Sequence, residues 1–310
     1  MIPISIEHIT KSYGRTAALE DISLDVNEGE IFGLIGPDGA GKTTLFRILV
    51  TLLVPDHGKA TVLGLDTVKD FRAIRRQVGY MPGRFSLYQD LSVEENLGFF
   101  ATIFNTTIQE NYELIRDIYQ QIEPFKNRPA GKLSGGMKQK LALSCALIHK
   151  PKVLFLDEPT TGVDAVSRTE FWDMLDRIRN HGISIMVSTP YMDEARLCDR
   201  VGLIQQGSLL SIDTPQAITD RYPHRLMAVK SESIYRLIND LNNYERTHSV
   251  YPFGEYLHFA PKEKSLGPDQ LKSFLQEKGY KNAVVKEIKA GIEDCFMELM
   301  SNHQKKETLS

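Results

Sequence analysis

A glycine-rich turn lies between an apolar run and an amphipathic segment near the start of the chain. Residues 30–36 read EIFGLIG, which is apolar nearly throughout and predicts a strand buried on both faces. Residues 42–53 read KTTLFRILVTLL, with apolar residues at helical spacing. The turn between them, GPDGAGKT, fits the pattern G-x-x-x-x-G-K-[ST] in the strand-to-helix context that the pattern requires. This order predicts an α/β fold with a phosphate-binding loop.

Backbone N–H groups of such a loop and of the following helix start can surround phosphate oxygens, and glycines permit the close approach. We expect Lys42 to reach the β- and γ-phosphates of a nucleotide and Thr43 to hold Mg²⁺. The alternative, an ordinary glycine turn, is disfavoured by the strand-to-helix context. The candidate nucleotide-binding residues of the loop are Gly36, Pro37, Asp38, Gly39, Ala40, Gly41, Lys42, Thr43 and Thr44.

A second apolar run, VLFLDEP at 153–159, ends in two carboxylates. Asp157 is placed at the carboxyl end of a predicted sheet strand, where α/β folds bind their ligands, and is expected to hold the Mg²⁺. Glu158 is expected to point to the other side of the pleat, where it could act as the catalytic general base toward a water. Two acids after a strand are usually the start of a solvated loop. The phosphate loop in the same chain favours the functional interpretation.

The segment KLSGGMKQKLALSCALI, residues 132–148, predicts a helix with Ser134 as its N-cap. Gly135 and Gly136 in the first turn cost helix stability, so a purely structural interpretation leaves both unexplained. Exposed amides at a helix start form an anion site, here without a lysine of its own. We expect Ser134, Gly135 and Gly136 to contact a phosphate that is bound elsewhere.

Composition narrows the class of protein. Hydrophobic residues make up 42% and charged residues 25%, as in globular proteins, and the formal net charge of −3 argues against nucleic acid as the main partner. Cys145, Cys198 and Cys295 are widely spaced and odd in number, which indicates a reducing compartment. The longest apolar stretch, at 45–54, is short and contains Arg47, so we expect a chain that neither spans a membrane nor is exported.

The order of predicted elements indicates two unequal domains. Strands and helices alternate over 152–205 and predict a parallel sheet covered by helices, while two strands are expected within 4–26. The predicted α/β domain comprises residues 1–222 and contains a helical insertion at about 84–145. A small C-terminal α+β domain is predicted at 223–303 and a polar tail at 304–310.

Four segments occur in the order and spacing of one family. The phosphate loop, LSGGMKQK, VLFLDEP and TTGVDAVSR make residues 4–220, approximately, resemble the ATP-binding cassette family. The resemblance implies a P-loop NTPase cassette with a mixed sheet and N-terminal antiparallel strands, an ATPase activity, and ATP and Mg²⁺ as cofactors. In that family two cassettes associate head to tail, and each ATP lies between one subunit's phosphate loop and the other subunit's LSGG helix. Ser134, Gly135 and Gly136 would then serve the nucleotide of a partner cassette.

Two further positions are carried over from the family. Tyr13 in KSYG matches an aromatic residue that stacks on adenine, which suits a tyrosine ring physically. The alternative is a surface tyrosine packed on its neighbours. Asp164 in GVD matches the loop that crosses the dimer, with Val163 where the family more often has leucine.

Two positions depart from the family. After VGYMP the family has a glutamine that contacts Mg²⁺ and the attacking water, and here the residue is Gly83; after IMVST it has a histidine that holds the γ-phosphate, and here the residue is Pro190. Loss of one such donor typically costs about 10²–10³ in rate, so we expect slow hydrolysis at this chain's own site. The alternative is that Tyr191, Gln77 or Gln89 replaces them. We hypothesise an asymmetric pair, in which the LSGG helix of this chain serves a competent site on a different cassette.

Within the family, GYMP, FSLYQDLSVEENL and the C-terminal GIEDCFMELM resemble the ATPase subunits of bacterial drug and polysaccharide exporters. That implies efflux by separate integral membrane permease subunits, a second cassette as homo- or heterodimer partner, and a cytoplasmic protein peripheral on the inner face of the cell membrane. Phe85, Leu87 and Tyr88 are candidates for a groove that receives the permeases, unless they are core residues. The alternative functions are a nearly non-hydrolysing regulatory cassette and a soluble cassette ATPase of DNA repair or translation.

Overall fold

The computed structural model describes residues 2–309, with side chains described through residue 303. The chain divides into two compact units, of which the first ends at Pro215 and the second begins at Gln216. The boundary proposed from the sequence, after residue 222, lies a little beyond this division and stays a proposal. Each unit has a hydrophobic core of its own.

The first unit contains an antiparallel sheet near its N-terminus with the strand order β2-β1-β4-β5. Ile4 and Ile6 of the first strand are buried and Glu7 is exposed, as period-two alternation requires, and a register shift after Ile6 returns Ile9 to the buried side. The first two strands were predicted and the short third and fourth were not. The bounds are β1 (Ile4–Tyr13), β2 (Thr16–Val26), β4 (His57–Val62) and β5 (Leu65–Asp66).

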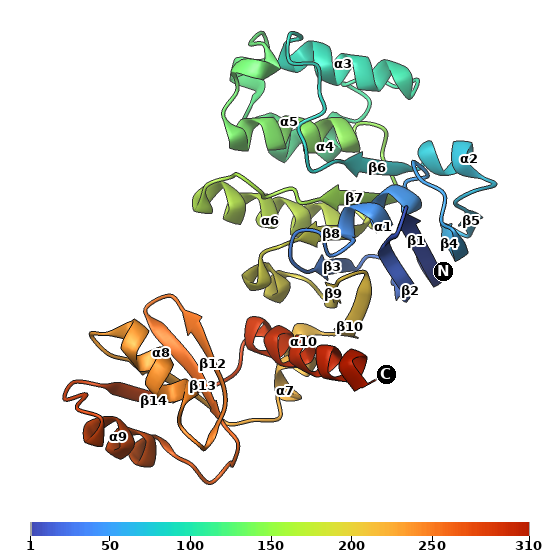
Figure 1. Ribbon diagram of the computed structural model, residues 1–310. Helices are drawn as coiled ribbons and strands as arrows, with labels where there is room; N and C mark the ends of the chain where they lie inside the picture. Colours follow the sequence, from blue (N-terminus) through green and yellow to red (C-terminus); the bar gives the residue numbers. More distant parts are fainter. Residues whose placement is uncertain (1, 310) are drawn as a thin grey trace. The chain divides into compact units, whose positions relative to one another are not determined.

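A six-stranded sheet with the order β10-β9-β3-β8-β7-β6 forms the centre of the unit, as Figure 1 shows. Its strands are parallel except the edge strand β10, which runs antiparallel to β9, so five carboxyl ends lie along one edge. The central strands are buried along their whole length, which explains their uninterrupted apolar sequences. The bounds are β3 (Ile31–Ile35), β6 (Val78–Met81), β7 (Val153–Asp157), β8 (Ser184–Thr189), β9 (Arg200–Gln205) and β10 (Ser208–Asp213).

Helices pack on this sheet, and the helical insertion lies beyond its β6 edge (Figure 1). The insertion's first helix starts with a capping box between Ser92 and Glu95, two residues that satisfy each other's backbone N–H groups. The insertion comprises α3 (Val93–Ile103), α4 (Tyr112–Tyr119), η1 (Glu123–Phe125), η2 (Ala130–Lys132) and α5 (Gly135–Leu147). The other helices are α1 (Lys42–Leu49), α2 (Phe71–Arg75), α6 (Ala165–Arg179), η3 (Met192–Leu197) and α7 (Pro215–Asp220).

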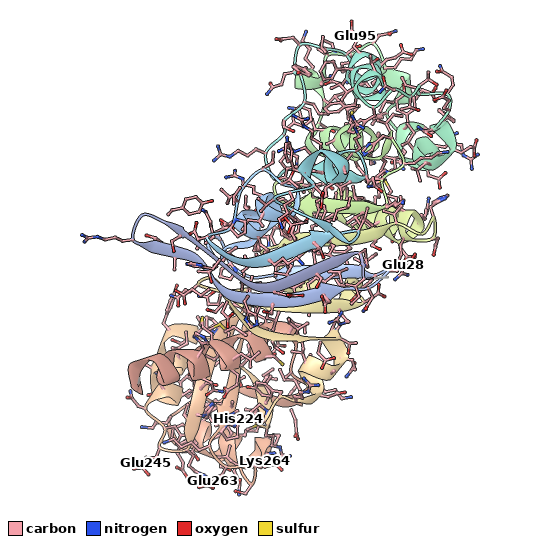
Figure 2. All side chains as sticks on the ribbon, turned by 90° about the vertical axis from the view of Figure 1, so that its right-hand side faces the viewer. Glu28, Glu95, His224, Glu245, Glu263 and Lys264 are labelled. Atoms are coloured by element: carbon pink, nitrogen blue, oxygen red, sulfur yellow. The ribbon has the colours of Figure 1, made fainter. Side chains whose placement is uncertain are left out.

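The second unit is an α+β domain built on an antiparallel sheet with the order β12-β13-β11-β14. Figure 2 labels four residues of this unit, among them His224, which lies two residues before the start of β11, the sheet's first strand in the chain. The elements are β11 (Leu226–Lys230), α8 (Ile234–Asn242), β12 (Thr247–Phe253), β13 (Tyr256–Pro261), α9 (Pro268–Glu277), β14 (Val284–Ile288) and α10 (Ile292–Leu309). The expected polar tail, 304–310, continues α10 as far as Leu309, and Ser310 lies outside the described residues.

Within residues 2–309 the structure contains no helix with the length and apolar character that a membrane span needs.

Candidate functional site

The phosphate loop joins β3 to α1 at the carboxyl edge of the parallel sheet. Lys42, the first residue of α1, is buried, and its Nζ donates hydrogen bonds to the carbonyl oxygens of Gly36 at 2.8 Å and Pro37 at 3.0 Å. The ammonium therefore lies inside the loop, where the motif predicts a bound phosphate.

Gly41, the N-cap of α1, is the residue that allows this loop to close. Its φ of 105° is left-handed, and a Cβ on it would lie 2.4 Å from the carbonyl oxygen of Ala18 in β2. The loop is thereby held against β2, and β2 forms a hairpin with the strand that carries Tyr13. The Tyr13 side chain is half exposed, with a relative accessibility of 50%, and its ring is accessible to a ligand.

Asp157 ends β7 and is buried beside the loop. Its Oδ1 accepts a hydrogen bond from Ser188 Oγ of β8 at 2.5 Å, and it also accepts one from the hydroxyl of Thr43. Burial raises the pKa of Asp157, and the hydrogen bonds from Ser188 and Thr43 and the charge of Lys42 offset this only in part. Ser188 was not among the predicted residues, although a polar residue at the carboxyl end of a strand was the available signal.

The second predicted acid, Glu158, lies beside Lys42 of the phosphate loop. Glu158 Oε1 lies 3.1 Å from Lys42 Nζ. The backbone of Glu158 is left-handed, with φ 50°, so the pleat of β7 ends before it, and its N–H donates to the carbonyl oxygen of Ser188 at 3.0 Å. Lys42, Thr43, Asp157 and Glu158 therefore form one cluster at the carboxyl ends of β3 and β7.

The oxygens of this cluster suit a hard divalent cation. Thr43 and Asp157 are joined by a hydrogen bond, so a hydroxyl and a carboxylate oxygen lie side by side. Mg²⁺ prefers such oxygen ligands and usually keeps waters and phosphate oxygens as its remaining ligands. These two residues fit the Mg²⁺ site predicted for them.

The LSGG segment begins α5 with Ser134 as the N-cap, whose Oγ accepts from the N–H of Met137 at 3.4 Å. A Cβ on Gly136 would lie 2.8 Å from Ser167 Oγ in α6, and one on Gly135 would lie 3.6 Å from the carbonyl oxygen of Gly162. Both glycines thus face the start of α6 and the loop before it. Gly135 and Ser134 are exposed, as a surface that meets another subunit's ligand requires.

Asp164 caps α6 next to that surface. Its Oδ1 accepts from the backbone N–H groups of Val166 at 3.1 Å and Ser167 at 3.0 Å. The hydrogen bond from the Ser167 backbone is the main reason that the pKa of Asp164 is lowered. The loop that was predicted to cross a dimer is therefore fixed by a negatively charged helix cap.

Gly83 and Pro190 follow β6 and β8, the two strands that flank β7. A Cβ on Gly83 would lie 3.0 Å from the carbonyl oxygen of Asp157 and 3.7 Å from Cβ of Glu158. A side chain at this position would therefore start beside the backbone of Asp157 and the side chain of Glu158. Neither Gly83 nor Pro190 supplies a polar side chain there.

The three proposed replacements have other neighbours. Gln77 precedes β6, at the end of the strand opposite Gly83, and its Nε2 donates to the carbonyl oxygen of Ala73. Gln89 packs on Gly131, with its Cβ 3.3 Å from the position of a Cβ there. The ring of Tyr191 lies under the guanidinium of Arg168, 4.7 Å from ring centroid to Cζ. Each of the three side chains thus has a contact outside the cluster around Lys42.

Comparison with known proteins gives a consistent result. The family model described as ABC transporter matches residues 19–161. The chain is 39% identical, over 79% of its length, to the probable multidrug ABC transporter ATP-binding protein YbhF of Escherichia coli, and spans 43% of that longer protein. It is 32% identical to the Nod factor export ATP-binding protein I of Mesorhizobium japonicum, over 96% of this chain and 86% of that protein.

Solved structures with the same fold include an ATP-binding subunit of an ABC transporter, with 25% identity and a TM-score of 0.65 over 72% of this chain and 93% of that one. A dimeric bacterial ABC transporter cassette has 25% identity and a TM-score of 0.62 over 68% of this chain and 98% of that one.

Proposed function

Because the chain belongs to the ABC transporter family of ATP-binding proteins, we propose that it is the nucleotide-binding ATPase subunit of an exporter. The observation that carries the proposal is the cluster in which the Lys42 ammonium lies within its own glycine loop and 3.1 Å from Glu158. Names of relatives, a multidrug transporter protein and a Nod factor export protein, support export.

The roles of the clustered residues follow from their chemistry. Lys42 and the loop amides would bind the phosphates of ATP, and Glu158 would accept the proton of the attacking water. Thr43 and Asp157 would hold Mg²⁺, which supplies neutralisation of the charge on the transferred phosphoryl group. Tyr13 would stack on the adenine.

Hydrolysis at this site is proposed to be slow, because Gly83 and Pro190, which follow the two strands beside β7, lack polar side chains. The intact cap and glycines at Ser134, Gly135 and Gly136 would then act on the ATP of a second cassette, and the dimeric cassette among the solved structures supports such a pairing. A different chain with a complete site is the partner that this asymmetry favours. The missing donors equally favour the second candidate function, a regulatory cassette that binds ATP and hardly cleaves it.

A cavity of about 320 Å³ supports contact with membrane subunits. Its lining is mostly apolar and comes from β6, α3 and α5 and the segment after β6, including Leu87. Of the other two residues predicted for this role, Tyr88 packs edge-to-face on Phe99, and Phe85 lies under the ammonium of Lys138. Permease subunits docked there would place the protein on the inner face of the cell membrane.

Calorimetry with MgATP tests the nucleotide site. We expect Lys42→Ala to weaken binding by about 10- to 100-fold, because a hydrogen bond to a charged group contributes about 1.5–3 kcal/mol. Lys138→Ala, a lysine of α5, is the matched control and should bind like the wild type. Absence of MgATP affinity in the wild type contradicts the proposal.

Steady-state ATPase assays test the pairing. The chain alone should turn over slowly, and mixing with the second cassette of its transporter should give fast turnover that Ser134→Arg abolishes. Fast turnover by the chain alone contradicts the asymmetric pair and leaves the ATPase assignment intact. ATP turnover that stays slow in every pairing favours the regulatory cassette.

A further inference from the structure

Three side chains from distant parts of the second unit converge on one point. His224 precedes β11, His248 lies in β12 and Glu298 lies in α10. Nε2 of His224 is 3.3 Å from Oε1 of Glu298, and Nε2 of His248 is 2.9 Å from Oε2 of the same carboxylate. One donor atom from each residue fits within 4.8 Å of the other two.

We propose that His224, His248 and Glu298 bind a divalent transition-metal ion, with Zn²⁺ as the best match, at a site separate from the nucleotide. Two imidazole nitrogens and one carboxylate are a recurring ligand set for Zn²⁺ and its neighbours in the first transition row. Mg²⁺, which prefers oxygen ligands, is a poor match. The donor chemistry therefore distinguishes this site from the one at Asp157.

The spacing of the donors is close to that of a metal site. Zn–N and Zn–O distances of about 2.0–2.2 Å in a tetrahedron place neighbouring donor atoms about 3.3–3.5 Å apart. The two nitrogen-to-oxygen distances are 3.3 Å to Oε1 and 2.9 Å to Oε2 of the same carboxylate, and the donor atoms lie within 4.8 Å of one another, so the side chains must adjust to admit the ion.

The two imidazole rings lie side by side at the cluster. The imidazoles of His224 and His248 stack with centroids 3.8 Å apart and planes 30° from parallel. Both rings face Glu298 through Nε2, and an imidazole nitrogen is the atom with which histidine binds a transition-metal ion.

The surroundings suit a site with one open position. Glu298 is nearly buried, with 9% of its side chain exposed, while His224 and His248 are 21% and 23% exposed. Asn302, one turn further along α10, donates to Oε1 of Glu298 at 3.1 Å and orients the carboxylate. Solvent can therefore reach the ion from the histidine side and supply a water as the fourth ligand.

Binding there would link β12, the segment before β11 and α10, which are far apart in the chain. Since a ligand that binds only the folded state stabilises it, the metal should stabilise the second unit selectively. The proposed metal site lies in this unit alone and does not depend on the proposed ATPase function.

The test is calorimetric titration of the full chain with ZnCl₂ after chelator treatment, without nucleotide. We expect one Zn²⁺ per chain, and a Co²⁺ complex with visible absorption bands that report histidine ligation. Loss of an outer partner already costs about 10- to 100-fold in metal affinity, so Glu298→Gln and His248→Gln should lose about 100-fold or more. His258→Gln is the matched control, because Nδ1 of His258 also pairs with an α10 carboxylate, Asp294, at 2.6 Å but is not part of the cluster.

Three results would overturn the proposal: no Zn²⁺ binding by the wild type, unchanged affinity in both ligand variants, or an equal loss in His258→Gln. If a ligand variant fails to fold by circular dichroism, the Co²⁺ spectrum of the wild type decides, since absence of histidine ligation rejects the site. MgATP affinity measured on Glu298→Gln should be unchanged, which separates failure here from failure of the nucleotide proposal.

Discussion

The Lys42 ammonium has three oxygen neighbours, the carbonyl oxygens of Gly36 and Pro37 and the carboxylate of Glu158. Phosphate oxygens that enter the loop must share this cation with Glu158. We therefore expect ATP binding to weaken the contact between Lys42 and Glu158, the general-base candidate, which must turn toward a water to act. At the scale of single residues, the proposed chemistry depends on whether the buried Lys42 interacts with Glu158 or with the phosphate oxygens.

Substitution Pro190→His should accelerate cleavage of bound ATP. Removal of one transition-state donor typically costs about 10²–10³ in rate, so its return should give up to about 10²-fold while Gly83 is still present. Single-turnover hydrolysis in the paired state measures this. Pro190→Ala is the control, because it restores a backbone N–H and adds no side-chain donor. An equal gain in both variants would show that the proline's rigidity, and not the missing donor, limits the rate.

Asp157 links the site to pH. Its pKa is raised above the ordinary value of 3.8 mainly by burial, so the folded state binds the proton more tightly than the unfolded state. The contribution of Asp157 to the free energy of unfolding should therefore fall as pH rises from below 3.8 through the raised pKa, and stay lower above it.

Asp157→Asn removes this titration. We expect its free energy of unfolding at neutral pH, without Mg²⁺, to equal or exceed that of the wild type, while stabilisation by MgATP is reduced. Urea unfolding between about pH 4 and pH 7 measures both. A variant that is less stable than the wild type at neutral pH would show that the hydrogen bonds of Asp157 with Ser188 and Thr43 outweigh its desolvation.

At the scale of elements, the start of α5 is packed against the start of α6. Gly136 leaves no room for a Cβ, because Ser167 Oγ lies 2.8 Å from its position, and the same hydroxyl donates to Asp164 Oδ2 at 2.8 Å. The LSGG surface and the cap of α6 are therefore coupled through one serine.

Gly136→Ala should lower the free energy of unfolding by about 1–3 kcal/mol, the usual cost of overpacking. Gly135→Ala adds the same methyl group one residue earlier, where the nearest atom is 3.6 Å away, and should be neutral or stabilising by up to about 1 kcal/mol. Urea unfolding compares the two. Equal losses would mean that helix-start conformation, and not contact with Ser167, decides the cost.

At the scale of the whole molecule, the two units have separate cores and two proposed ligands of different chemistry. MgATP at 100 times its dissociation constant should stabilise the first unit by about 2.7 kcal/mol, and Zn²⁺ at a similar excess should stabilise the second. Hydrogen exchange measured by mass spectrometry locates each effect. Protection by either ligand that spreads equally over both units would show that they unfold as one.

Much of the first unit could be predicted because its signals are local. Strand, turn and helix around GPDGAGKT are contiguous, and burial on both faces makes β3, β7 and β8 apolar throughout. The strands β4 and β5 and the helix α2 were missed, since they are short and their apolar pattern is weak. In the second unit the alternation of short strands and helices was again a local signal, and it was sufficient to predict the order of these elements.

The sequence by itself determined which groups can bind a phosphate, because a loop of adjacent residues carries that chemistry wherever it folds. Only the tertiary structure decided what those groups touch: Glu158 beside Lys42, the position of Gly83 against Asp157, and two histidines and a glutamate at one point. These residues are separated by tens of positions along the chain, so no sequence pattern predicts that they lie close together. Strand pairing in the first unit and the packing of α10 in the second bring them together. The free energy that drives this comes from burying apolar surface throughout each unit's core, and not from local sequence.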